Sequence, residues 1–397
     1  MANVETFDVV VIGGGPAGAT AATDLAKLGR SVLLLDRAGR IKPCGGAIPP
    51  QAMREFEIPE SMLASQVNSA RMVSPTDRTV DMPINGGYVG MVDREHFDEW
   101  LRERAATAGA TRRTGTFEQI ERDTDGTALV CYRPGQGRSG SDSERVRARA
   151  VIGADGAHSS VAKQCIPGSE GMKFVSAYHE IVRTPAGFDG TRCDVYYQGD
   201  ISPDFYGWVF PHGATVSVGV GTAVEGFSLR SACTELRRRA GLADAETLRR
   251  EGAPIPLEPL RCWDNGRDIV LAGDAAGVVA PASGEGIYYA LAGGRLAGEA
   301  VAEFLTTGKA AALQSARKKF MKAHGKVFWV LGIMQRFWYA NDKRRERFVS
   351  LCADPDIQYL TWEAYMNKRL VKARPGAHLR IFFKDMAHLL GIVSPRS

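Results

Sequence analysis

A glycine-rich turn near the N-terminus has the spacing of a phosphate-binding loop. Gly13, Gly15 and Gly18 fit the pattern G-x-G-x-x-G, with Pro16 and Ala17 between the last two glycines. The first glycine allows a tight turn, the second lets a pyrophosphate approach the backbone, and the third lets a helix pack closely on a strand. The helix that follows would offer its N–H groups to the phosphates. The loop therefore predicts dinucleotide binding, against the alternative of a glycine-rich structural turn.

Acidic residues stand where such a ligand would need acceptors. Asp36 closes the second apolar run, where a carboxylate accepts bonds from a ribose 2′-OH. Arg37 favours a ligand with a 2′-phosphate, whereas Asp36 would repel that phosphate. These two residues alone therefore do not decide which dinucleotide is bound.

Two further glycine–aspartate elements each follow a buried apolar run, where ligands bind in open parallel sheets. They contain Asp155 with Gly156, and Gly273 with Asp274. The structural alternative for either aspartate is a turn residue.

Together the three elements resemble the FAD-binding fingerprints of glutathione-reductase-like, hydroxylase-type flavoproteins. The resemblance implies that the glycine loop holds the pyrophosphate and Asp36 the adenosine ribose. It also places Asp155 near the nicotinamide and pyrophosphate region and Asp274 at the ribityl chain. Arg94 matches the arginine that begins a flavin-facing helix. The sequence has no second G-x-G-x-x-G after a strand, so a nicotinamide reductant would visit the flavin transiently.

Three more segments extend the resemblance over nearly the whole chain: KPCGGA at 42–47, YGWVFP at 206–211 and PASGEGI at 281–287. With the FAD motifs, they resemble the geranylgeranyl reductase family. The basic, aromatic C-terminal segment is similar to the photosynthetic branch, and most to its bacteriochlorophyll-pathway enzymes. The resemblance implies that NADPH reduces FAD. It also implies reduction of three of the four double bonds of a geranylgeranyl chain, carried by (bacterio)chlorophyll or by diphosphate, to phytyl.

The glycines of these segments have expected roles beside the flavin. Gly284, Gly286 and Ile287 would bring N–H groups at a helix start to the pyrimidine edge, which stabilises the anionic reduced flavin. The alternative is a glycine cap or helix packing. The loop of Cys44, Gly45 and Gly46 is expected to face the flavin as well. Cys44 is a candidate acid or positioning group, or simply a small packing residue.

Three aromatic residues alternate along one predicted strand. Tyr206, Trp208 and Phe210 have the spacing that puts their rings on one face. Such a wall suits a polyprenyl chain, and we assign Tyr206 and Trp208 to catalysis as well as substrate binding. The alternative is ordinary sheet core. His179 and His212 are further candidate acids, although a structural histidine is the favoured interpretation of each.

The charge is unevenly distributed. Residues 309–397 carry 18 Lys and Arg against 6 Asp and Glu, net +12, whereas residues 1–308 carry 32 against 39, net −7. Between residues 317 and 347, ten basic residues alternate with aromatic ones. This composition suits a helix in an anionic membrane interface, and the alternative is a solvated face with the aromatics in the core. We expect a peripheral protein on the cytoplasmic side of the photosynthetic membrane.

The elements that must position these residues follow from apolar periodicity. Runs at 7–12, 31–35, 148–154 and 269–272 predict buried strands, and 16–28, 94–108 and 286–304 predict helices. Residues 206–211 and 215–221 predict antiparallel strands of an inserted lobe. The expected fold is α/β: a glutathione-reductase-like FAD-binding Rossmann domain with an antiparallel-sheet (α+β) substrate domain and a helical C-terminal segment. The predicted domains are residues 1–75, 93–170 and 262–308 for FAD, 76–92 and 171–261 for substrate, and 309–397.

Composition narrows the alternatives. With 44% apolar and 24% charged residues, the chain is neither disordered nor a disulfide scaffold. Seven cysteines without a CxxC predict no metal site and a reducing compartment. No apolar stretch reaches the ~20 residues of a spanning helix, and no nucleic-acid reader motif is present. An aromatic hydroxylase-type monooxygenase and a non-catalytic, flavin-binding membrane assembly factor stay open as rival functions.

Overall fold

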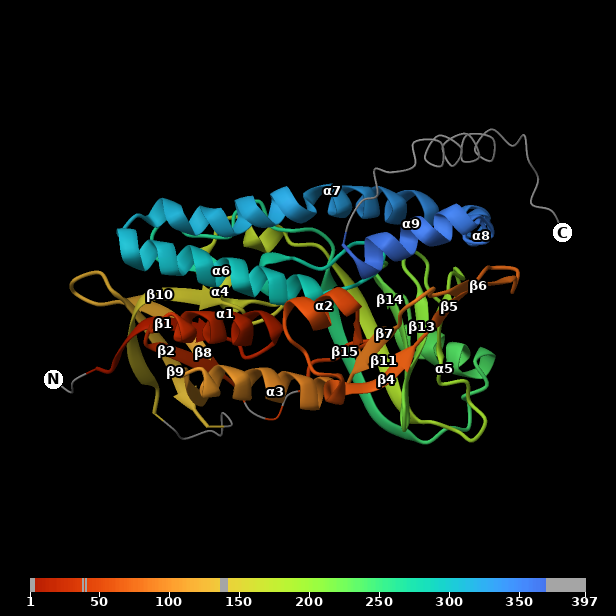
Figure 1. Ribbon diagram of the computed structural model, residues 1–397, viewed down its shortest axis with the longest axis horizontal. Helices are drawn as coiled ribbons and strands as arrows, with labels where there is room; N and C mark the ends of the chain where they lie inside the picture. The colour runs from red at the N-terminus through yellow and green to blue at the C-terminus, as the bar shows by residue number, and fades with distance from the viewer. Residues whose placement is uncertain (1–3, 38, 40, 136–141, 369–397) are drawn as a thin grey trace. The chain divides into compact units, whose positions relative to one another are not determined.

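The computed structural model describes residues 4–37, 39, 41–135 and 142–368 (Figure 1). The chain divides into two compact units, each built from three separate segments. The first unit comprises Met1–Lys42, Arg94–Phe174 and Pro254–Phe328, and the second comprises Pro43–Asp93, Val175–Ala253 and Trp329–Ser397. Both combine helices with sheets, and the predicted α/β class is confirmed.

The first unit is organised around a six-stranded sheet. Its strands are β1 (Thr6–Ile12), β2 (Val32–Asp36), β8 (Thr111–Arg122), β9 (Ala128–Pro134), β10 (Glu144–Gly153) and β16 (Ile269–Leu271). Strands β8, β2, β1, β10 and β16 form a parallel ladder in that order. Both β8 and β10 also pair with β9 in an antiparallel direction. The carboxyl ends of β1, β2, β10 and β16 therefore meet at one edge, which carries the predicted ligand motifs.

Small residues allow the helices of this unit to pack closely. α1 (Pro16–Lys27) and α6 (Ile287–Thr307) run side by side in Figure 1. A Cβ added at Gly294 of α6 would lie 2.1 Å from the carbonyl oxygen of Ala17, so only glycine permits this approach. Further helices of this unit are α3 (Arg94–Thr107), α4 (Ser160–Cys165) and the short turns η2 (Ser169–Gly171), η3 (Gly273–Ala276) and η4 (Ala310–Gln314).

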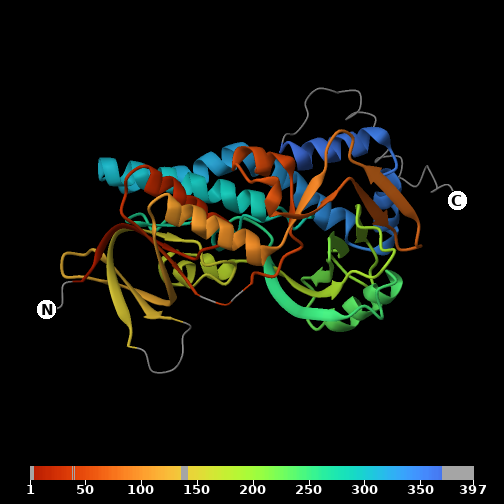
Figure 2. The same ribbon diagram turned by 60° about the horizontal axis from the view of Figure 1, so that its bottom comes forward.

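The second unit contains a seven-stranded and a three-stranded sheet. The larger runs β15 (Thr247–Pro256), β11 (Phe174–Arg183), β14 (Thr215–Thr222), β13 (Gly207–His212), β12 (Arg192–Tyr196), β5 (Ser69–Val73) and β6 (Thr79–Pro83). The smaller runs β3 (Ala47–Ile48), β7 (Val89–Val92) and β4 (Leu63–Val67), near α2 (Pro50–Glu55) and η1 (Glu60–Met62) in sequence. Helix α5 (Leu229–Arg239), green in Figure 2, covers β14 with Ala232, Cys233 and Leu236.

The C-terminal segment is helical where it is described, as predicted. It forms α7 (Ser315–Trp338), α8 (Asp342–Leu351) and α9 (Pro355–Met366). Buried Arg345 ties α8 to its unit by donating to the carbonyl oxygens of Tyr339 and Pro203, and Asp342 accepts from Gly199 N at 3.0 Å. None of the helices in the described ranges is long and apolar enough to cross a membrane. The predicted segment 309–397 continues beyond residue 368, outside the described residues.

The compact units differ from the predicted domains at several places: residues 254–261, predicted for the substrate domain, belong to the first unit, and residues 329–368 belong to the second. Residues 43–75, assigned to the FAD domain, belong to the second unit, because β3 and β4 pair with β7 and β5 pairs with β12. Residues 309–328 belong to the first unit, where buried Leu313 and Phe320 contribute to the core. The assignment of cofactor binding to one unit and substrate binding to the other stays a prediction from the sequence motifs.

Candidate functional site

The glycine loop forms the tight turn that its spacing predicts. Gly13 has a φ of +104°, and its amide donates to Leu35 O at 2.8 Å. A Cβ at Gly13 would lie 2.2 Å from the carbonyl oxygen of Ala154, and one at Gly18 would lie 1.9 Å from that of Gly13. Both positions therefore require glycine so that β1, β10 and α1 can pack. Gly14, which the motif leaves unspecified, is equally enclosed, because its Cβ would lie 2.7 Å from Asp36 Oδ2.

Gly15 differs from its neighbours because nothing in the chain requires it. Its φ of −75° and ψ of −174° are accessible to any residue, and no atom lies within 4 Å of an added Cβ. It is also the N-cap of α1 and makes no side-chain cap bond, so the first N–H groups of that helix have no capping side chain. Open space beside helix N–H groups is what a bound pyrophosphate needs. This cradle, with Pro16 and Ala17 in its first turn, fits a dinucleotide.

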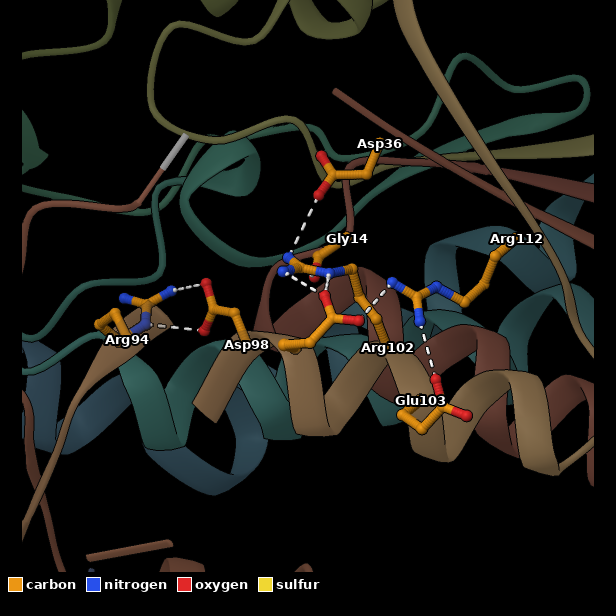
Figure 3. A network of polar contacts seen from close by, with 8 residues as sticks. Gly14, Asp36, Arg94, Asp98, Arg102, Glu103 and Arg112 are labelled. Atoms are coloured by element: carbon orange, nitrogen blue, oxygen red, sulfur yellow. Dashed lines mark hydrogen bonds and ion pairs between the residues drawn. The ribbon is translucent and has the colours of Figure 1, made fainter. Parts of the chain in front are cut away.

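Asp36 belongs to a network that sequence reasoning missed (Figure 3). Arg102 of α3 donates through Nη1 to Asp36 Oδ2 at 3.3 Å and to Gly14 O at 3.4 Å. Glu99 accepts from Arg102 and also from Arg112, which reaches Glu103. Burial raises the pKa of Asp36, while a backbone bond from Gly14 and the charge of Arg102 oppose the rise. Its side chain keeps 29% of its surface exposed, which leaves oxygen available to a ribose hydroxyl.

Two neighbours of Asp36 have different surroundings. Arg37 lies exposed directly after β2. Arg94 begins α3, as predicted, but its buried guanidinium makes a bidentate pair with Asp98 at 2.7 and 2.8 Å, as Figure 3 shows. A contact of Arg94 with FAD stays a prediction.

Asp155 follows β10 and serves a local purpose. Its carboxylate accepts from Ser160 N at 2.7 Å and Val161 N at 3.2 Å and pairs with the Ser159 hydroxyl at 2.5 Å. The side chain therefore caps the N-terminus of α4, which is the turn role weighed from the sequence. Burial raises its pKa. Gly156 next to it has a φ of +89° with open space around it. A contact of either residue with the cofactor stays a prediction.

Asp274 lies at the end of β16 and forms an ion pair with Lys42, the residue that precedes the PCGGA segment. Gly273 has a φ of +64°, and its Cβ would lie 2.7 Å from that of Ala17, which draws this turn against α1. The sequence offered no signal for Lys42 as a partner, because the two residues are 232 positions apart.

The PASGEGI segment forms a tight turn into α6. Ala282 and Gly284 have left-handed φ values of +62° and +64°, and Gly284 N donates to Ala280 O at 3.0 Å. Gly286 is the N-cap of α6, without a side-chain cap bond, and Ile287 is the first helical residue. The helix start can therefore offer N–H groups to an anionic edge, as predicted for the flavin pyrimidine.

The loop of Cys44, Gly45 and Gly46 is fixed within the second unit. Gly46 has a φ of +74°, and its amide donates to Cys44 Sγ at 3.3 Å. His212 Nε2 lies 3.1 Å from Gly45 O, and burial lowers the pKa of His212 to about 4. The neutral imidazole donates this bond, because a carbonyl only accepts. His212 therefore positions the loop.

Trp208 and Phe210 share one face of β13, and Tyr206, directly before the strand, packs against Trp208; Tyr206 and Trp208 are both buried. The centroids of Tyr206 and Trp208 are 6.1 Å apart, and those of Trp208 and Phe210 are 6.4 Å apart. Val209, between them, points into the core cluster on the opposite face. The Phe210 ring also lies 3.1 Å from a Cβ added at Gly45, so this glycine makes room for the ring. The aromatic face therefore packs against the PCGGA loop.

A buried polar chain behind Trp208 was not predicted. Ser217 lies between the Trp208 indole and His179, and His179 continues to Glu251. Neither Ser217 nor Glu251 belongs to a recognisable motif. Among the described residues, no group of three or more His, Cys, Asp and Glu could hold a metal ion.

Most aromatic residues between 317 and 347 belong to the core, and a contact of this stretch with a membrane stays a prediction. Phe320, Phe328, Trp338 and Tyr339 are buried, as the alternative interpretation held. Trp329 of α7 is exposed, with 69% of its surface accessible, and Tyr359 of α9 is exposed as well.

The comparisons with known proteins agree with the motifs. A family model described as FAD binding domain matches residues 6–327. A geranylgeranyl diphosphate reductase of Rhodobacter capsulatus is 58% identical over 393 residues, covering 98% of this chain and 99% of its own. One from Synechocystis sp. is 35% identical over 399 residues, covering 96% and 97%.

A solved structure supports the fold. A geranylgeranyl bacteriochlorophyll reductase-like protein from Thermoplasma acidophilum has a TM-score of 0.79 at 22% identity, covering 94% of this chain and 100% of its own. The open cradle at Gly15 fits the FAD to which the family model refers. The chain therefore belongs to the geranylgeranyl reductase family, among the hydroxylase-type FAD-binding proteins.

Proposed function

We propose that this chain uses FAD and NADPH to reduce three isolated double bonds of a geranylgeranyl chain to phytyl in (bacterio)chlorophyll biosynthesis. The tail is carried by (bacterio)chlorophyll or by diphosphate. The observation that carries the proposal is the aromatic face of β13, because its rings pack against the PCGGA loop of the same unit. Three rings in a row offer an apolar wall to a polyprenyl chain.

The residues of the first unit would hold the cofactor. The turn from Gly13 to Gly18 and the start of α1 suit the pyrophosphate, and Asp36 suits the adenosine ribose. Asp274 suits the ribityl chain, and the start of α6 suits the pyrimidine edge. When bound, FAD takes electrons from NADPH and supplies hydride to the substrate.

The alkene dictates what the other residues must do. Saturation of one double bond adds a hydride to one carbon and a proton to the other, and NADPH becomes NADP⁺. Because no carbonyl polarises the bond, positive charge develops at the tertiary carbon. The π-faces of Tyr206, Trp208 and Phe210 would stabilise that charge while excluding water. Cys44 is our candidate for proton delivery.

A membrane partner follows from the surface of α7. Six of the exposed residues of this helix recur at helical spacing on one face: Lys318, Lys322, Lys326, Trp329, Ile333 and Arg336. Basic side chains around two exposed apolar ones suit the interface of an anionic bilayer, where a polyprenyl or pigment-linked substrate resides. We propose peripheral attachment to the cytoplasmic side of the photosynthetic membrane through this face.

The decisive experiment is anaerobic incubation of the FAD-loaded protein with NADPH and either geranylgeranyl diphosphate or geranylgeranyl-bacteriochlorophyll. Mass gains of two, four and six hydrogens would support the proposal, and the substrate that gives them identifies the tail carrier. Omitting NADPH is the control. Consumption of NADPH without a reduced product would overturn both substrate assignments.

The rival functions give different results in the same assay. A monooxygenase of this fold would add oxygen to its product and would require air. An assembly factor would bind flavin and membrane without consuming NADPH at a substrate-dependent rate.

A further inference from the structure

Four side chains of the second unit form an unbroken hydrogen-bond chain. Trp208 Nε1 donates to Ser217 Oγ at 3.1 Å, and Ser217 Oγ lies 3.0 Å from His179 Nδ1. His179 Nε2 lies 3.0 Å from Glu251 Oε2. Ser217 and His179 are buried to 0% and 3% exposure, and the Glu251 side chain keeps 17%. The hydrogen-bond chain thus crosses β13, β14 and β11 to β15, the edge strand of this sheet.

The chemistry of its two ends fixes the direction of the two outer hydrogen bonds. An indole Nε1 only donates and a carboxylate only accepts. The bond from His179 holds the pKa of Glu251 below its usual range, so Glu251 is ionised at neutral pH. In the neutral form of His179, Nε2 donates to Glu251 and Nδ1 accepts from the Ser217 hydroxyl, which in turn accepts from the indole. All four members are satisfied, which makes the arrangement specific.

Glycines provide the space in which the indole lies. Trp208 is paired with Gly219 on β14, where an added Cβ would lie 2.2 Å from indole Cζ2. On the side of the PCGGA loop, a Cβ at Gly45 would lie 4.0 Å from indole Nε1. Only glycine at position 219 lets the indole pack this closely on β14, and in that packed position the bond to Ser217 holds indole Nε1.

We propose that Ser217, His179 and Glu251 are positioning residues that fix the indole plane of Trp208 against the PCGGA loop. This inference rests on the proposed function, in which Trp208 lines the path of the polyprenyl chain. A ring of fixed orientation offers the same face to each double bond as the chain advances. A ring free to turn would obstruct the path, so products would accumulate after one or two reductions.

The arrangement is tested first without substrate, on the FAD-loaded protein labelled with ¹⁵N-tryptophan. The Trp208 indole resonance is identified by its loss in Trp208→Phe. We expect Ser217→Ala to shift this resonance and to speed its hydrogen exchange roughly tenfold or more. Ser74→Ala removes another fully buried hydroxyl of the same unit and should leave the resonance in place. An unchanged resonance in Ser217→Ala would overturn the assignment, whatever the substrate proves to be.

The functional consequence is tested by a double-mutant cycle. Ser217→Ala should lower kcat roughly tenfold, with partly reduced products, while the same change in Trp208→Phe should alter kcat less than twofold. The melting temperature should fall in both backgrounds, because His179 Nδ1 loses its hydrogen-bond partner in each. Equal kcat losses in both backgrounds would mean that Ser217 merely supports the fold.

A second variant guards against failure of Ser217→Ala to fold. His179→Leu removes the acceptor that orients the Ser217 hydroxyl, so the Trp208 resonance should shift in the same way. An unaltered Trp208 resonance in His179→Leu would contradict the proposed hydrogen-bond chain. Failure of the wild-type protein to reduce the geranylgeranyl substrates would refute the proposed function while leaving the resonance test intact.

Discussion

The backbone conformation at position 15 does not require the glycine that stands there. Its angles suit any residue and the chain leaves the space above it open, whereas Gly13 and Gly18 are enclosed by carbonyl oxygens. One motif therefore contains two kinds of glycine, one for folding and one for a ligand. Substitution can separate them.

We predict that Gly15→Val abolishes FAD binding while the apoprotein stays folded, because the new side chain would occupy the pyrophosphate cradle. Absorbance of the purified protein near the flavin bands and its circular dichroism give the two readouts. Gly190→Val, where a Cβ also meets nothing within 4 Å, should keep its flavin. Gly18→Val should lose both flavin and fold. Flavin-loaded Gly15→Val protein would disprove this role of the loop.

His212 predicts a pH dependence of stability. Its pKa is about 4 in the folded protein and 6.5 as a free side chain, because burial disfavours the charged ring. The unfolded chain therefore binds the proton more readily, and stability falls as the pH drops from about 6.5 towards 4. His212→Gln can still donate to Gly45 O without titrating. Over this interval its melting temperature should fall less than that of the wild type, by on the order of 2 °C. An equal fall in the melting temperature of both proteins would contradict the lowered pKa of His212.

At the scale of single residues, the sequence predicted the positions of the motif residues better than the side chains that contact them. The glycine loop and Asp36 follow from spacing that is local in the chain. Arg102 and Lys42 are brought to their aspartates by tertiary structure across 66 and 232 positions, which no local pattern encodes. Asp155 is the opposite case. It follows a strand within a predicted ligand motif, but its carboxylate caps the start of a helix.

At the scale of elements, β13 has two different faces. Trp208 lies on the aromatic face, and Val209 points into the core beneath α5. The period of two was predictable from the sequence, and so were β1, β2, β10, α1 and α3 to within a few residues. The pairing partners of β13 were not, because register depends on neighbours far along the chain.

We predict that Trp208→Ala lowers turnover at least tenfold while the flavin content stays near that of the wild type, because the ring lines the substrate path. Val209→Ala is the matched control on the same strand. It should lower the melting temperature and leave the product distribution unchanged. Equal losses of flavin and turnover in Trp208→Ala would show that the ring is core.

At the scale of the molecule, the charge split now has a more definite location. Up to residue 368, the basic segment is a packed set of helices, and on α7 exposed basic and apolar residues share one face. The sequence could not show this, because ten basic residues and six aromatics fit either a core or an interface until burial is known.

We predict that the protein sediments with vesicles of phosphatidylcholine and phosphatidylglycerol but not with phosphatidylcholine alone, and that high salt releases it. The double variant Trp329→Ser, Ile333→Ser should weaken binding roughly tenfold by removing the apolar contact. Tyr359→Ser removes an exposed ring of α9 and should have little effect. Binding that survives high salt and carbonate would argue against attachment by charge.

The segmental make-up of the two units has a consequence for biosynthesis. The central strand β1 pairs with β10 roughly 140 residues later, and the sheet gains its last strand, β16, only near residue 270. Most of the chain must therefore be synthesised before either unit can fold completely. Until then, apolar strands stay unpaired during translation. The growing polypeptide is a natural client for chaperones, and cofactor loading belongs to the end of synthesis.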